Sequence, residues 1–324
     1  MHFVFGDKMQ TYNRDWKIYN QRLVNRGKVV TILIHSSLIR SETLQKMNEK
    51  KVGRPFRFCS GLISAAFAVK CVLRLPYRQL QGFMMDVCEK LHKRIPDFRT
   101  IWWRIDQMKN DGIKFSVHKG KHTVIAIDST GLRPVNDGEY RSFRYDNRKE
   151  WIKLHAVIDV KTKEILNVKV TKGNVNDCLE FSDVINPVSE ISSEILADKG
   201  YDSTKIFEYC DRNNIICRIP VKLNATNRSK RSASRRNAIE EQLKIICKPG
   251  YASRGLHCVP KEDREKNQEQ WKIDVKYGRR SLIESSFSRY KRILGENVFS
   301  RKTGNIEKEI TAKVNVLNQF TVAN

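Results

Sequence analysis

The sequence lacks a long apolar run, a cysteine pattern and a leader-like start, and each absence excludes a class of protein. Its longest apolar stretch is LISAAFAV at residues 62–69, whereas a membrane-spanning helix needs roughly 18 or more such residues. The eight cysteines include no C-x-x-C pair, which argues against a zinc ribbon and against a disulfide framework. The first residues do not have the layout of a signal peptide. We therefore expect a cytoplasmic protein with reduced cysteines and no membrane partner.

Acidic residues are also scarce relative to basic ones. The chain has 36 Asp plus Glu against 61 Lys plus Arg, which gives a formal net charge of +25. Repulsion among so many positive charges does not help folding, and a polyanionic partner is the usual reason for a large positive net charge. Nucleic acid is the first candidate, because phosphate neutralisation dominates that kind of binding. An anionic membrane surface is the second candidate, and the lack of a long apolar run argues against it.

The first part of the chain, residues 1–120, is expected to be a mostly helical DNA-binding region. Three segments with helical periodicity follow one another at 59–75, 77–95 and 97–110, and prolines or a glycine mark their ends. Basic residues on the second and third helices make 59–110 similar to a helix-turn-helix arrangement. A three-helix bundle with a solvated basic surface would show the same pattern.

The second part, residues 121–324, is expected to form an α/β domain. Short runs rich in β-branched residues alternate with helical patterns in the order β-β-β-α-β-α-β, followed by a closing helix. The expected strands cover 122–130, 151–160, 164–172, 193–201 and 215–222, and the helices between them cover 176–188 and 202–214. This order is that of the ribonuclease-H-like fold, in which a mixed five-stranded sheet lies between helices.

Between residues 223 and 270 the periodicity is lost and basic residues accumulate. The segment is too polar and too charged to bury a core, so we expect a basic insertion that lies outside the core. We interpret it as a loop that DNA phosphates order, although a solvated loop would have the same composition. The basic residues predicted to contact DNA are Arg228, Lys230, Arg231, Arg235 and Arg236.

Three acidic residues are expected to meet at one edge of the sheet. Asp128 and Asp198 each end an apolar strand, where an unpaired charge is costly, and Glu284 lies on the closing helix. Asp159 also ends an apolar strand but leads into a tight turn, so we interpret it as a turn residue. Three carboxylates without histidine suit Mg²⁺ or Mn²⁺. Two such ions, about 3.5–4 Å apart, activate a water or a 3′-hydroxyl in phosphodiester cleavage.

The closing helix, YGRRSLIESSFSRYK at residues 277–291, carries two stripes of side chains. The apolar stripe, which should pack on the core, consists of Ile283, Phe287, Tyr290 and Leu294. The second stripe falls within roughly 60° around the helix axis at about 100° per residue, and it consists of Tyr277, Arg280, Glu284 and Lys291. A surface ion pair between Arg280 and Glu284, four residues apart, is the plain alternative for part of this stripe.

Three blocks of sequence resemble the catalytic blocks of DDE-type insertion-sequence transposases. They are AIDSTG at 126–131, LADKGYDS at 196–203, and the closing helix. The helix fits the Y-(2)-R-(3)-E-(6)-K signature of that group, the IS-four/IS-five-like superfamily, at every position. The resemblance implies a ribonuclease-H-like transposase that binds the terminal inverted repeats of an insertion sequence and catalyses DNA cleavage and strand transfer.

The same resemblance implies roles for individual residues and for partners. Asp128, Asp198 and Glu284 would be the catalytic residues and would hold two Mg²⁺ or Mn²⁺ ions. Tyr277, Arg280 and Lys291 would contact phosphates of the element end. The implied partners are double-stranded DNA, at the element ends and at the target, and a second copy of the chain in a homodimeric complex on DNA.

Three other interpretations of the sequence remain open. The chain could be a transposase-derived DNA-binding protein that has lost catalysis, although all three acids are present. It could be a ribonuclease-H-like nuclease without strand transfer, although simple hydrolysis has less need of the Tyr, Arg and Lys of the signature. A basic interaction protein without enzymatic activity would not explain why acids end the apolar strands.

The charge imbalance predicts a steep dependence of DNA affinity on salt. A protein that neutralises six to ten phosphates loses about 10³-fold or more in affinity between roughly 50 and 200 mM salt. Titration of a fluorescent duplex at several salt concentrations measures this slope. A flat profile would rule out binding that is dominated by phosphate contacts.

Overall fold

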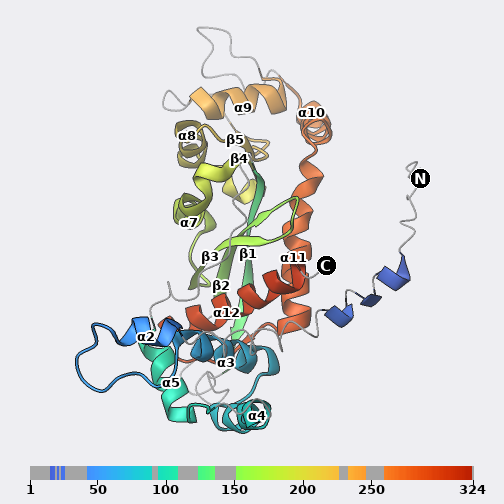
Figure 1. Cartoon of the computed structure of the whole chain (residues 1–324). Helices are drawn as coiled ribbons and strands as arrows, with labels where there is room; N and C mark the ends of the chain where they lie inside the picture. Colours follow the sequence, from blue (N-terminus) through green and yellow to red (C-terminus); the bar gives the residue numbers. More distant parts are fainter. Residues whose placement is uncertain are drawn as a thin grey trace, which may run out of the picture.

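The structure of the chain is a computed structural model, shown in Figure 1. It describes residues 15–18, 20, 21, 23–25, 42–89, 94–108, 123–135, 151–225, 233–245 and 259–322. A central sheet has helices on both of its faces, and the helices between residues 42 and 107 gather at one end of the molecule (Figure 1). The mostly helical start and the α/β remainder agree with the expectation from the sequence.

The sheet has the strand order β3-β2-β1-β4-β5, with a short β6 beside the far end of β1. Its strands are β1 Thr123–Pro134, β2 Ile152–Asp159, β3 Ile165–Lys172, β4 Ser192–Ala197, β5 Ile216–Arg218 and β6 Asn297–Val298. The first three strands pair antiparallel, whereas β4 pairs parallel to both β1 and β5. The predicted ribonuclease-H-like sheet, mixed and with β1 at its centre, is therefore confirmed.

Each face of the sheet buries its own apolar cluster. Because side chains alternate along a strand, Ile125 and Ile127 of β1 enter one cluster and Ala126 and Leu132 enter the other. The helices whose residues join the first cluster are α7 Asp177–Ile185, α8 Thr204–Arg212 and α9 Ala233–Leu243. Those on the second face are α11 Ser281–Leu294 and α12 Thr303–Val322. The centre of the sheet is thus covered from both sides.

The helical region consists of α2 Glu42–Asn48, α3 Ser60–Leu73, α4 Tyr77–Glu89 and α5 Phe98–Gln107. The side chain of Asp97 caps α5 by accepting hydrogen bonds from the backbone N–H groups of Arg99 and Thr100. Lys308 of α12 donates to the carbonyl oxygens of Ile105 and Asp106, at 2.9 and 3.0 Å, at the end of α5. α12 therefore joins the helical region to the sheet.

Two further features belong to this helical region. Within the described ranges no single helix is long and apolar enough to cross a membrane, and α3 and α4, which reach the length together, are bent by 114°.

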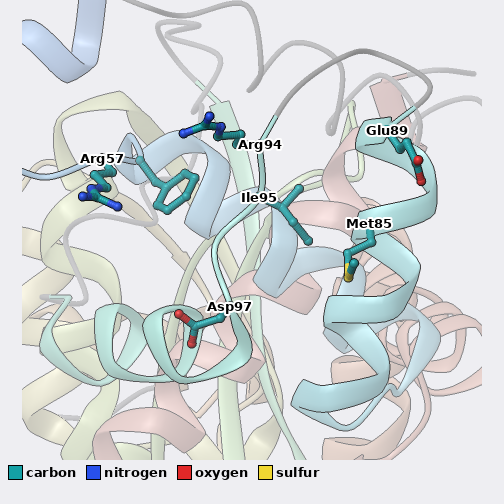
Figure 2. A pocket seen from close by; sticks show the side chains of 7 residues that line it. Arg57, Met85, Glu89, Arg94, Ile95 and Asp97 are labelled. Carbon is teal, nitrogen blue, oxygen red and sulfur yellow. The ribbon is translucent and has the colours of Figure 1, made fainter.

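A groove of about 910 Å³ lies beside the end of α4 and the segment before α5 (Figure 2). It carries charges of both signs, and its lining residues are Arg57, Phe58, Met85, Glu89, Arg94, Ile95 and Asp97.

Several elements differ from their predicted extent. β5 stops at Arg218 because Pro220 has no N–H to donate to a strand ladder. The stretch 277–291 is not one helix, since a 3₁₀ turn, Tyr277–Arg280 (η5), precedes α11. The expectation that 223–270 lies wholly outside the core is also wrong, because α9 buries Ile239 and Leu243 in the first cluster. Its basic residues occupy the first turns and its apolar residues the last ones.

A buried ion pair fixes α12 to the loop that follows α11. Glu309 and Lys313 are 1% and 0% exposed, and Nζ of Lys313 lies 2.9 Å from Oε1 of Glu309. Lys313 also donates to the carbonyl of Asn297 at 2.7 Å, and Glu309 accepts from the backbone N–H groups of Phe299 and Ser300. Burial alone would raise the pKa of Glu309, but Lys313 and these hydrogen bonds lower it below its ordinary value.

Lys313→Met should therefore reduce the free energy of unfolding by about 3–5 kcal/mol, because it leaves Glu309 buried without its cation. Lys261→Met is the control, since Lys261 and Glu265 form an exposed i,i+4 pair that contributes about 0.5 kcal/mol or less. Denaturant titrations measure both losses. Equal, small losses would show that the buried pair does not hold α12 in place.

Candidate active site

The pairing of β1 with β4 places two aspartates side by side. In this parallel register Ala126 lies opposite Leu196, and Ile127 lies opposite Ala197. The next residue of each segment is Asp128 and Asp198. Asp128 lies within β1, which continues to Pro134, and not at its end as predicted. Asp198 follows β4 directly, as predicted.

Glu284 approaches the same edge from α11. Because side chains alternate along β1, Asp128 shares the face of Ala126, which packs against α11. A cavity of about 680 Å³ opens between β1 and α11. Its lining residues are Asp128, Ser129, Thr130, Glu284, Phe287, Ser288, Lys291 and Arg292. The apolar stripe of α11 is buried in the second cluster, so the core fixes the side of the helix that carries Glu284.

Arg280 lies between two of the three acids. Its Nη1 donates to Oδ2 of Asp128 at 3.2 Å, and its Nη2 donates to Oε1 of Glu284. The side chains of Arg280 and Asp128 are 18% and 21% exposed, whereas that of Glu284 is 54% exposed. One guanidinium therefore neutralises charge from both the strand and the helix.

Tyr277 ties the η5 turn to the end of β4. Its hydroxyl donates to the carbonyl oxygen of Ala197, the residue before Asp198, at 2.8 Å. Its ring lies beside that of Trp271, with 6.1 Å between the ring centroids. Trp271 is 5% exposed and its indole N–H donates to Glu241 at 3.1 Å, so its ring is part of the support for this turn.

The charges at this edge act on one another. Burial raises the pKa of Asp128, the Ser129 N–H and Arg280 lower it, and the nearby negative charges of Asp198 and Glu284 raise it further, with a net increase. Burial lowers the pKa of Arg280, but Tyr277, Glu284 and Asp128 raise it above its ordinary value. The three acids thus form one electrostatic group, with Arg280 as its counter-charge.

The donor set fits a hard divalent cation in its chemistry. All three side chains offer carboxylate oxygens, which Mg²⁺ and Mn²⁺ prefer. Across the described ranges, however, no three Asp, Glu, His or Cys side chains converge closely enough to hold a metal ion as they stand. The position of Arg280 between Asp128 and Glu284 gives a physical reason, because its guanidinium keeps those carboxylates bonded to itself.

The other predicted residues have varied surroundings. Lys291 lines the cavity with Glu284. Asp159 is the turn residue that was predicted, since it accepts hydrogen bonds from the N–H groups of Lys161 and Thr162. Arg236 is partly buried on α9. Its contact with DNA stays a prediction, and Arg228, Lys230 and Arg231 lie outside the described residues.

Arg235 takes part in an ion pair that the sequence did not indicate. Its Nε and Nη2 donate to the two carboxylate oxygens of Asp202 at 2.8 and 3.0 Å. The side chain of Asp202 has no exposed surface, and it also accepts from the N–H of Lys222. Because Arg235 and Asp202 are 33 positions apart in the chain, no local sequence pattern indicates this pair. A DNA contact by Arg235 is untested, but its guanidinium already holds α9 beside the η3 turn, Lys199–Tyr201.

The sheet is ribonuclease-H-like, and it carries acids on β1, directly after β4 and on α11. A family model described as "Transposase DDE domain" matches residues 119–318, and a second with the same description matches residues 24–137. The first covers more than half of the chain, which therefore belongs to the family of DDE transposases. The protein is accordingly an enzyme that cleaves and transfers DNA strands.

Two solved structures show a distant likeness to the chain. One is the piggyBac transposase synaptic complex with hairpin DNA, at 14% identity and a TM-score of 0.37, over 93% of this chain and 74% of that chain. The other is the simian T-cell lymphotropic virus intasome in complex with PP2A regulatory subunit B56 gamma. It has 12% identity and a TM-score of 0.23, over 64% of this chain and 68% of that chain.

Tyr277→Phe removes only the hydroxyl that holds Ala197. It should reduce the free energy of unfolding by about 1 kcal/mol and slow DNA cleavage about tenfold, because the backbone before Asp198 is less fixed. Its affinity for DNA should stay unchanged. Binding and single-turnover cleavage measured together check this, since weaker binding at unchanged stability would favour the predicted phosphate contact instead.

Proposed function

We propose that the chain is the transposase of an insertion sequence from the IS-four/IS-five-like superfamily, with the Y-(2)-R-(3)-E-(6)-K signature. It would bind the terminal inverted repeats of its element and perform cut-and-paste transposition. The observation that carries the proposal is the β1–β4 register, which sets Asp128 beside Asp198, together with Glu284 on α11 across the cavity.

Asp128, Asp198 and Glu284 would hold two Mg²⁺ or Mn²⁺ ions. Bound there, the ions would activate a water or a 3′-hydroxyl and stabilise the leaving oxygen. The protein itself places the three carboxylates on two rigid elements and one strand end. The cavity between β1 and α11, which is open to solvent at Glu284 and Arg292, would give a phosphodiester a route to Asp128 and Glu284, which line it.

Two basic side chains would hold the DNA at this cavity. Lys291 lines it on the same helix as Glu284, seven residues further along, so its ammonium group can reach a phosphate next to the acids. Arg280 has a planar fork of donors that suits phosphate as well as carboxylate. The net charge of +25 supports contacts with double-stranded DNA beyond the site, including the helical region.

A homodimer on DNA is part of the proposal. An insertion sequence has two ends, and the chain offers one set of three acids. Two copies would therefore be needed to process both ends in one complex. The molecular mass of the protein in solution can be measured with and without a duplex that carries an element end. This measurement distinguishes the homodimer on DNA from a monomer that acts on each end separately.

Asp128→Asn, Asp198→Asn and Glu284→Gln should each slow metal-dependent cleavage by at least about a hundredfold, because each removes a negative ligand from the metal ions. Affinity for DNA should stay within a few-fold of that of the unmodified protein. The substrate is a labelled duplex taken from the DNA that flanks the coding region. Strand-transfer products separate a transposase from a nuclease of the same fold.

Asp159→Asn is the matched control for these substitutions. Asp159 also ends an apolar strand, but its carboxylate accepts turn hydrogen bonds, which an asparagine side chain can accept as well. The control should cleave at the normal rate. Normal cleavage by any of the three active-site variants would instead contradict the assignment of that residue.

A further inference from the structure

Arg280 occupies the space between two side chains that the proposed function assigns to metal ions. It donates to Oδ2 of Asp128 and to Oε1 of Glu284 with separate nitrogens. A divalent cation held by Asp128 and Glu284 would compete with Arg280 for these two carboxylates. When a guanidinium bonds to a carboxylate oxygen, it occupies a lone pair that a metal ion could otherwise use. The positive charge of the guanidinium would also repel a metal ion beside it.

We propose that Arg280 is an internal counter-ion that must leave Asp128 and Glu284 before the site can bind metal, and that DNA phosphate takes the released guanidinium. Metal binding and capture of the DNA end are then linked through this one side chain. The inference rests on the proposed function, and it gives Arg280 a role beyond contact with a phosphate.

The surroundings of Arg280 make such an exchange feasible. Glu284, which is 54% exposed, faces the solvent side of the cavity, so a guanidinium that leaves it moves toward solvent and not into the core. Lys291 lines the same cavity, so a phosphate that it holds would lie beside the acids. Arginine binds carboxylate and phosphate with the same bidentate geometry, so one partner can replace the other.

The exchange makes two binding events favour each other. In the absence of DNA, the ion pairs of Arg280 compete with metal and weaken its binding. With a phosphate available, the guanidinium has another partner and the competition falls. Because coupling between two ligands is reciprocal, metal must strengthen DNA binding by the same factor by which DNA strengthens metal binding.

The neighbouring Arg279 provides a matched control. It lies on the same η5 turn, but its Nη2 donates to Glu194 of β4 at 2.9 Å and to the carbonyl of Val275 at 3.1 Å. Its substitution removes the same charge from the same turn without freeing a catalytic carboxylate. An effect of overall charge would appear in both variants, whereas the proposed competition would appear only at Arg280.

The first experiment measures Mn²⁺ binding to the full chain without DNA, by the paramagnetic resonance signal of free Mn²⁺. Arg280→Gln should bind Mn²⁺ about tenfold more tightly than the unmodified protein, and Arg279→Gln should bind it equally. Circular dichroism verifies folding. Should Arg280→Gln not fold, Arg280→Lys replaces it, because one ammonium group cannot span both acids and Mn²⁺ affinity should again rise.

The outcomes separate this inference from the proposed function. Equal Mn²⁺ binding by the unmodified protein and Arg280→Gln, abolished in both by Asp128→Asn, would overturn the inference and leave the metal site intact. No Mn²⁺ binding by either protein would overturn the metal site itself and the inference with it. Tighter binding in Arg280→Gln and Arg279→Gln alike would reduce the effect to net charge and overturn the inference.

A second measurement tests whether bound metal strengthens DNA binding through Arg280. Fluorescence anisotropy gives the affinity for a short blunt duplex in Ca²⁺ and in EDTA at matched ionic strength. The affinity in Ca²⁺ divided by the affinity in EDTA should be about tenfold larger for the unmodified protein and for Arg279→Gln than for Arg280→Gln. The same ratio in all three proteins would show that Arg280 does not carry the coupling.

Discussion

The parallel pairing of β1 with β4 is the interaction on which the position of the acidic residues depends. A strand pair in register fixes the relative positions of all residues along it, and a slip by one residue would turn every side chain to the opposite face. Here the register that seats Ile127 beside Ala197 also sets the positions of the two aspartates that follow. The buried clusters on both faces hold that register, because a slip by one residue would move Ile125 and Ile127 out of the cluster in which they pack and turn them to the opposite face.

The third acid depends on a different set of contacts. Glu284 is carried by α11, which is seated by its apolar stripe and preceded by the η5 turn. Tyr277 joins this turn to the end of β4, and Arg280 joins it to β1. The buried pair of Glu309 and Lys313 fixes the loop after α11 to α12. The helix is thus held at both ends, and the guanidinium of Arg280 at its start links Glu284 to Asp128 of β1.

Much of the fold follows from local patterns that a sequence displays. The β-branched runs predicted β1 to β4, and the three apolar helical segments before them correspond to α3, α4 and α5. The prediction failed where composition was judged over too long a window. Residues 223–270 are basic on average, but Ile239 and Leu243 sit together on the last turns of α9 and reach the core. The break between η5 and α11 left no signal, because its residues fit a helical period equally well.

The sequence by itself determined the chemistry of the site. It showed which acids end or interrupt apolar strands and which basic residues recur beside Glu284. It also showed a positive net charge that favours a polyanionic partner. The order of strands and helices predicted that Asp128, Asp198 and Glu284 would share one edge of the sheet. Only the tertiary structure decided the partners of the basic side chains. Arg235 pairs with Asp202 and Arg280 with Asp128, because residues 33 and 152 positions apart meet only when the sheet and its helices pack. Local periodicity carries no information on such distant ion pairs.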